Sequence, residues 1–133
     1  MKTKISIIGA GNLGKAIAHG LVKSDSFSSE NLVLTRRNLS EINAFKTLGI
    51  QVTDNNSFAV KMSDLVIVCV GPQDAEQVLT SFKEELDSKK HILISTMTGI
   101  SINKIKSIVG QQIPIVRVMP NIAVAICESM TCI

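Results

Sequence analysis

Three glycines near the start of the chain have the spacing of a phosphate-binding loop. Gly9, Gly11 and Gly14 form a G-x-G-x-x-G pattern. In this motif the first glycine permits a tight turn, the second lets a pyrophosphate approach the backbone, and the third lets a helix pack closely on a strand. The N-terminus of the following helix then offers unpaired N–H groups and a partial positive charge to the phosphates. The glycines therefore predict binding of a dinucleotide.

The motif requires a strand before the glycines and a helix after them, and the flanking residues supply both. A short β-branched run, Ile5 to Ile8, is typical of a buried strand. From Asn12 to about Lys23, apolar residues recur at spacings of three and four, which predicts a helix. A glycine turn without a ligand is the alternative, but these flanks favour nucleotide binding.

Two arginines follow the second predicted strand, where a fold of this kind meets the adenosine ribose. The strand covers Asn31 to Thr35, and Arg36 and Arg37 come directly after it with no acidic residue beside them. A carboxylate here would accept a hydrogen bond from the 2′-OH of NAD, whereas arginine suits the 2′-phosphate of NADP. Two solvated arginines at a strand end are the alternative. We interpret the pair as a preference for NADP(H) over NAD(H).

The remaining chain alternates between strand-like and helix-like segments. We expect strands at 50–53, 64–70, 91–96 and 113–118, helices at 40–48, 75–86 and 102–109, and a short helix or turn at 55–62. This alternation predicts an α/β fold, a Rossmann-type doubly wound parallel sheet with strand order 3-2-1-4-5-6. We expect residues 1–133 to form one NAD(P)-binding domain.

Composition excludes several classes of protein. The chain is 45% apolar and 19% charged, as in globular proteins, and its net charge of +3 is too weak and scattered to favour nucleic acid. No apolar run has the length of a membrane span, and we expect no leader segment. Cys69, Cys127 and Cys132 lack metal-ligand spacing, so we expect no metal and three free thiols in a reducing cytoplasm. His19 fits a solvated surface position and His91 a structural one, and we assign no catalytic residue.

Three segments, considered together, carry a family resemblance. They are residues 7–17 (Ile-Ile-Gly-Ala-Gly-Asn-Leu-Gly-Lys-Ala-Ile), 117–121 (Arg-Val-Met-Pro-Asn) and 128–131 (Glu-Ser-Met-Thr). With this order and spacing, the chain resembles the amino-terminal half of pyrroline-5-carboxylate reductase. That family reduces the cyclic imine 1-pyrroline-5-carboxylate to L-proline with NAD(P)H, the last step of proline biosynthesis. The resemblance implies an oxidoreductase that acts on a C=N bond of a small-molecule imine.

The resemblance also implies positions for the site residues. Asn12 and Leu13 would join the glycines over the pyrophosphate, and Arg36 and Arg37 would lie where the family binds the adenosine phosphate. Thr35, at the strand end 21 residues after Gly14, is a cofactor-binding candidate by its position. The remaining positions fall into three groups: Val70, Gly71 and Pro72 on the adenosine side, Thr98 and Gly99 at the nicotinamide edge, and Met119, Pro120 and Asn121 beside the nicotinamide, where the imine would dock.

The chain departs from the family pattern at several positions. Gly71 stands where the family usually has a lysine, Ile122 and Ala123 replace a Thr-Pro pair, and Ser129 replaces a glycine. Ile122 thereby removes a hydroxyl next to the substrate. The family continues into a helical dimerisation domain that is absent from these 133 residues. We therefore expect a homo-oligomer for the full-length form and poor activity for this part alone.

Two other functions stay open. One is a non-catalytic NADP-binding module or paralogue, which Ile122 and Ala123 favour. The other is a different NADP-linked reductase on the same type of sheet, of the β-hydroxyacid dehydrogenase or coenzyme F420-dependent type. Fold alone does not determine substrate, so the evidence against these enzymes is the Met-Pro-Asn loop.

The carboxyl end predicts a surface that requires a partner. Residues 122–127 form an unbroken apolar run, whereas a helix lying on its own domain should show polar residues toward solvent. We expect this patch to cause self-association in isolation.

Overall fold

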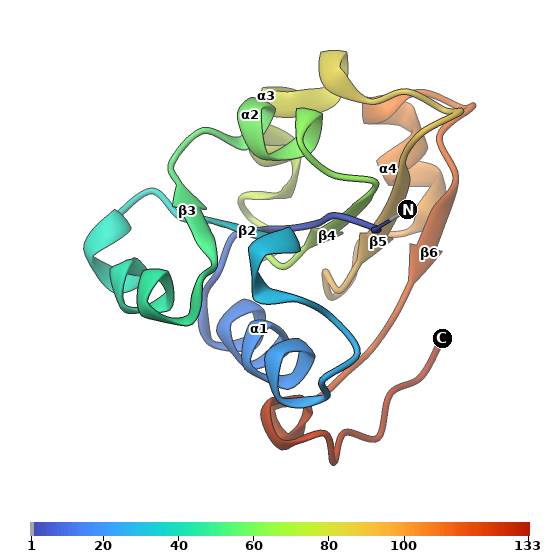
Figure 1. The fold of residues 1–133 in the computed structure, drawn as a ribbon. Helices are drawn as coiled ribbons and strands as arrows, with labels where there is room; N and C mark the ends of the chain where they lie inside the picture. Colours follow the sequence, from blue (N-terminus) through green and yellow to red (C-terminus); the bar gives the residue numbers. More distant parts are fainter. Residues whose placement is uncertain (1) are drawn as a thin grey trace.

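The computed structural model describes residues 2–133, in which strands and helices alternate along the chain (Figure 1). The strands are β1 (Ile5–Ile8), β2 (Leu32–Thr35), β3 (Gln51–Thr53), β4 (Leu65–Val68), β5 (Ile92–Ser95) and β6 (Ile115–Arg117). The α-helices are α1 (Asn12–Lys23), α2 (Asn56–Lys61), α3 (Ala75–Phe82) and α4 (Ile102–Val109). Short 3₁₀-helices add η1 (Ser29–Asn31), η2 (Leu39–Glu41), η3 (Asn43–Leu48), η4 (Lys83–Glu85) and η5 (Ile122–Ile126).

The six strands form one parallel sheet in the order β3-β2-β1-β4-β5-β6, which confirms the predicted doubly wound fold. At its centre Ile7 pairs with Leu34 on one side and with Ile67 on the other. The strand order reverses between β1 and β4. Ligands of such sheets bind at the carboxyl ends of the strands beside this switch point.

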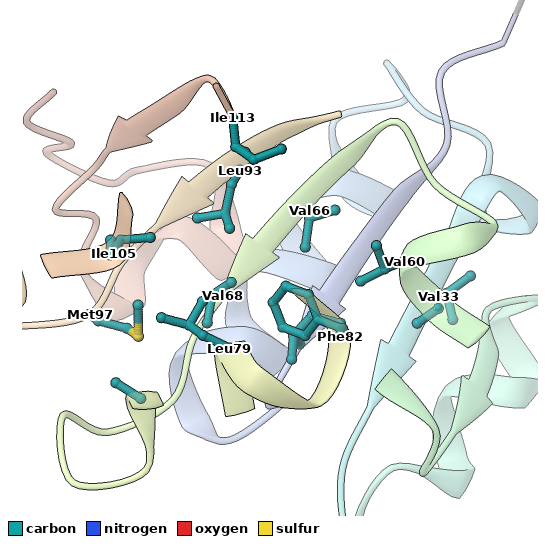
Figure 2. Close-up of a cluster of buried hydrophobic side chains, with 13 residues drawn as sticks. Val33, Val60, Val66, Val68, Leu79, Phe82, Leu93, Met97, Ile105 and Ile113 are labelled. Carbon is teal, nitrogen blue, oxygen red and sulfur yellow. The ribbon is translucent and has the colours of Figure 1, made fainter. Parts of the chain in front are cut away.

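Helices cover both faces of the sheet, so its strands are apolar on both sides. In β4, Val66 and Val68 belong to the core beneath α2, α3 and α4, where Figure 2 shows them beside Leu79 and Phe82 of α3. Ile67 points to the opposite core, beneath α1. Figure 1 shows α1 on one side of the sheet and the other three helices on the other side. This sandwich fixes the carboxyl ends of the strands in place.

The predicted helix at 40–48 is wrong, because this segment forms the 3₁₀-helices η2 and η3. Its apolar residues, Ile42, Phe45 and Leu48, repeat at intervals of three, which matches the 3.0 residues per turn of a 3₁₀-helix. Ile42 and Phe45 are buried, whereas Leu48 is exposed. The segment ends at Gly49, whose φ of 83° lies in the left-handed region that favours glycine.

Other boundaries differ from prediction by a few residues. Strand β4 ends at Val68, two residues before the predicted end, and β6 is shorter than the predicted 113–118 at both ends. Asn31 belongs to η1 and not to β2. His91 is structural, as predicted: it is buried, its Nδ1 accepts from the Asp87 N–H at 2.9 Å, and its Nε2 lies 3.1 Å from the Val60 carbonyl oxygen.

The carboxyl end packs on α1. In η5 the carbonyl of Val124 crosses directly over Gly20, where any added Cβ would overlap its oxygen. Cys127 donates from Sγ to the Gly20 carbonyl at 3.5 Å. Figure 1 shows η5 beside α1, far from its sequence neighbours in the sheet. One side of the predicted apolar patch is therefore covered, while Ile122 and Ile126 stay 60% and 55% exposed.

Candidate functional site

A groove of about 400 Å³ lies at the carboxyl ends of β1, β2 and β4. Many of the residues predicted from the glycine motif and the arginine pair meet here. The lining residues are Ile8, Gly9, Gly11, Thr35, Arg36, Arg37, Asn38, Glu41, Asp54, Asn56, Cys69, Val70, Gly71, Asp74 and Val78.

The glycines have the geometry that the motif requires. Gly9 has a φ of 82°, and a Cβ there would overlap the side chain of Val70. At Gly14 a Cβ would lie 3.1 Å from the Gly9 carbonyl oxygen and 3.2 Å from Cγ2 of Ile7, so the helix and strand pack as closely as expected. Both positions therefore favour glycine, the first for its backbone conformation and the second for its size.

The N-terminus of α1 opens beside the groove. Gly11 is its cap residue, and among the described residues no side chain bonds to the first turn, which also contains no acidic residue. The free N–H groups and the helix dipole thus attract an anion. A Cβ at Gly11 would meet only Nη1 of Arg36, at 3.2 Å.

Thr35 joins the glycine loop to the end of β2. Its Oγ1 accepts from the Gly9 N–H at 3.2 Å, and its carbonyl accepts from the Ala10 N–H at 2.8 Å. Thr35 is buried. These two bonds hold the loop in position, so Thr35 shapes the groove as well as lining it.

The two arginines are held differently. Nη1 of Arg36 donates to the Ala10 carbonyl at 3.0 Å, and Nη2 pairs with Oε2 of Glu41. The side chain of Arg37 is 85% exposed, and its Nη2 lies 3.7 Å from Oδ1 of Asp74. Arg36 is thus fixed against the glycine loop, whereas Arg37 reaches into solvent at the groove.

Three carboxylates that were not predicted also line the groove. Glu41 comes from η2, Asp54 follows β3, and Asp74 immediately precedes α3 without a side-chain cap hydrogen bond. The sequence next to the arginines contains no acid, but the fold brings Glu41 and Asp74 to them. Glu41 was missed because its segment was assigned to a regular helix. No local sequence pattern predicts the position of Asp74, because it comes close to Arg37 only through the pairing of β4 with β1 in the sheet.

Cys69 contributes a thiol to the same wall. Burial raises its pKa from 9.0 to about 11, and a hydrogen bond with the Thr96 side chain opposes part of that rise. The thiol is therefore protonated near neutral pH.

Several predicted site residues lie outside the groove lining. Pro72 is exposed beside it, Asn12 is exposed on α1, and Leu13 packs with the core beneath that helix. Thr98 and Gly99 are exposed after β5, and Gly99 has a φ of 75° with open space around its missing side chain.

The loop after β6, which was predicted to lie beside the nicotinamide, makes hydrogen bonds to the residues that follow it in the chain. Met119 pairs in an antiparallel bridge with Cys132, and Pro120 is partly buried. Asn121 accepts from the Ala123 N–H at 3.0 Å through Oδ1, and its own N–H donates to Oγ of Ser129 at 3.1 Å. In this conformation Asn121 caps η5.

Arg117 precedes this loop. It pairs with Ser95, which lies on the same face of the sheet as Leu93, and Leu93 belongs to the core beneath α4. The side chain of Arg117 therefore faces α4. Its Nε is buried, and no hydrogen-bond partner is found for it in residues 2–133. Within the same range, no cluster of His, Cys, Asp or Glu has the geometry to hold a metal ion. Nor does that part of the chain contain a helix long and apolar enough to cross a bilayer.

Residues 4–99 match the family described as NADP oxidoreductase, coenzyme F420-dependent. Over 129 residues the chain is 46% identical to pyrroline-5-carboxylate reductase 1 of Dictyostelium discoideum, which covers 97% of this chain and 23% of the relative.

Two solved structures show the same fold. A pyrroline-5-carboxylate reductase from Coxiella burnetii superposes with a TM-score of 0.91 at 27% identity, covering 98% of this chain and 48% of that one. The Plasmodium falciparum pyrroline carboxylate reductase with NADP bound gives a TM-score of 0.84 at 28% identity, covering 96% and 45%. The chain thus spans less than half the length of these relatives.

Proposed function

The chain belongs to the family of NADP oxidoreductases described as coenzyme F420-dependent, and from that membership we propose that it is the cofactor-binding part of an NADPH-dependent pyrroline-5-carboxylate reductase. The proposed reaction reduces the C=N bond of 1-pyrroline-5-carboxylate and yields L-proline. The observation that carries it is the match to reductases of this name over nearly the whole chain, glycine loop included. We further propose that residues 1–133 are one domain and that the substrate is a small imine. The full-length protein is proposed to be a cytoplasmic homo-oligomer.

The residues of the groove fit a dinucleotide phosphate. The open N-terminus of α1 suits the pyrophosphate, because its N–H groups have no side-chain partner within the described chain. The exposed side chain of Arg37 can reach the 2′-phosphate, and Arg36 is hydrogen-bonded to the glycine loop next to it. Val70 and Gly71 form the apolar wall beside the adenosine.

The chemistry that bound NADPH supplies is a hydride for the imine carbon. The protein's part is to orient the reactants and exclude water. We propose that Thr98, Gly99, Met119, Pro120 and Asn121 line the nicotinamide side, since they all follow the carboxyl ends of β5 and β6.

We predict that NADPH binds this chain more tightly than NADH. Charge-assisted hydrogen bonds to the 2′-phosphate contribute about 1.5–3 kcal/mol each, so the preference should be roughly 10- to 100-fold. Arg36→Ala combined with Arg37→Ala should reduce this ratio, and Gly11→Val should abolish binding of both cofactors while the fold survives. Calorimetric titration measures all three effects.

Circular dichroism of each variant is the control for folding. Equal or tighter NADH binding in the unaltered chain would contradict the preference. Normal cofactor affinity in a folded Gly11→Val variant would show that the phosphates bind elsewhere.

The family description favours a second candidate, a reductase that uses coenzyme F420. The complete protein distinguishes the two. Consumption of NADPH with pyrroline-5-carboxylate and formation of proline support our proposal, whereas electron exchange between NADPH and F420 without imine reduction supports the second. A protein that binds NADPH and performs neither reaction would be the non-catalytic module.

A further inference from the structure

Glu41 occupies a position in the groove where it can affect which cofactor binds. Its Oε2 pairs with Nη2 of Arg36, and the two side chains are 40% and 32% exposed. The turn before it is fixed, because Oδ1 of Asn38 accepts from the N–H and the hydroxyl of Ser40 at 3.1 and 2.7 Å. The Glu41 N–H then donates to the Asn38 carbonyl at 3.2 Å. The backbone of Glu41 is therefore fixed at the groove, and its carboxylate pairs with Arg36 from that position.

The guanidinium of Arg36 is engaged at both of its ends. Nη1 donates to the Ala10 carbonyl on the glycine loop, and Nη2 is paired with Glu41. A guanidinium carries five N–H donors in a fixed fork, so a phosphate approaching it must share that fork with the carboxylate. A phosphate dianion bound to this guanidinium would lie beside the Glu41 carboxylate, and the two negative charges would repel each other, only partly screened by solvent.

The same carboxylate affects a ribose hydroxyl differently. An uncharged 2′-OH is not repelled, and it can donate to a carboxylate oxygen, as the acidic residue of NAD-specific folds accepts it. Glu41 lies six positions beyond the end of β2, so the local sequence around Thr35 does not show this acid.

Resting on the proposed function, we infer that Glu41 is a specificity-determining residue that lowers the affinity for NADP(H) and supports the affinity for NAD(H). Without Glu41, the arginines would give a preference for the phosphorylated cofactor that exceeds the roughly 10- to 100-fold expected of the unaltered chain. With Glu41 beside Arg36, the preference is smaller, and both cofactors remain usable.

Glu41→Gln tests the inference because it removes the charge and keeps the shape of the side chain. Calorimetric titration should show NADPH binding roughly 3- to 10-fold tighter and NADH binding a few-fold weaker. Adenosine 2′,5′-bisphosphate and adenosine 5′-monophosphate should reproduce the divergence, since these probes lack the nicotinamide half.

Glu76→Gln is the matched control. It makes the same change of net charge, but Glu76 is 74% exposed on α3, where it pairs with Lys104 outside the groove. Its affinities for both cofactors should equal those of the unaltered chain.

The outcomes separate the two proposals. Unchanged NADPH affinity in Glu41→Gln, or an equal change for both cofactors, would overturn the role of Glu41 alone. Weaker NADPH binding would also overturn it, because Glu41 would then only hold Arg36 in place. Failure of NADPH to bind the unaltered chain would overturn the proposed function, and this inference with it.

Discussion

Cys69 shows how a single residue on the groove wall couples stability to pH. Burial raises the pKa of its thiol from 9.0 to about 11, so the folded chain retains this proton when the unfolded chain loses it. Between these two pH values the unfolded state binds fewer protons, and stability falls as pH rises. Below pH 9 both states hold the proton, and the thiol causes no pH dependence.

We predict that Cys69→Ala removes this part of the alkaline destabilisation. The shift of two units corresponds to at most about 2.7 kcal/mol of unfolding free energy, lost between pH 9 and 11. Urea unfolding of both chains at pH 8 and pH 10.5 measures it, and the difference between the two chains should change over this interval. An identical pH dependence in both chains would mean that the thiol titrates normally.

Residue types near the site were easier to predict than their partners. The glycines and Arg36 and Arg37 follow from local spacing, and the structure places all but Gly14 along the groove, with Gly14 just behind it. Glu41 and Asp74 were not predicted, since their approach depends on the path of η2 and on the start of α3. Local sequence carries backbone geometry well and the electrostatics of long-range contacts poorly.

At the scale of elements, α1 and η5 depend on one small residue. Alanine at position 20 would overlap the Val124 carbonyl, although it favours an isolated helix by about 1 kcal/mol over glycine. We predict that Gly20→Ala detaches η5 and leaves α1 intact. Amide hydrogen exchange should show lost protection at 123–128 and retained protection in α1. Retained protection at 123–128 would mean that the two elements shift apart without separating.

The elements themselves show where periodicity is sufficient. Buried strands such as β4 were predicted because a short, continuous apolar run that ends at a turn is typical of a parallel strand covered on both faces. The segment at 39–48 shows where periodicity is insufficient. Apolar residues at intervals of three fit one face of an α-helix as well as a 3₁₀-helix, and Asn38 and Gly49 fit the ends of either helix type. The position of η5 on α1 had as its only signal Gly20, the glycine of that helix that lies outside the G-x-G-x-x-G motif.

At the scale of the whole molecule, the strand order was predictable and the surface of the tail only partly so. Handedness and the glycine motif together allow few sheet orders, and the predicted one is confirmed. The tail was predicted to present an apolar patch, and η5 covers part of it while leaving Ile122 and Ile126 exposed.

We predict that this remaining patch makes the chain self-associate. Ile122→Glu combined with Ile126→Lys leaves the net charge unchanged and should shift the protein toward monomer, because exposed apolar patches promote association. Sedimentation at increasing concentration measures the effect. Phe58→Glu with Met62→Lys is the matched control, since both residues are 38% exposed on or beside α2. A monomeric unaltered chain at every concentration would contradict the prediction.

The position of the groove along the chain has a consequence for synthesis on the ribosome. Every residue that lines it lies between Ile8 and Val78, and the four strands around it, β3, β2, β1 and β4, are complete at Val68. Chains emerge N-terminal end first, at about 5–20 residues per second. All residues that line the groove are therefore synthesised before β5, β6 and η5. A nucleotide that binds these four strands would stabilise the nascent chain by mass action, and η5, which follows β6 in the chain, can reach α1 only later.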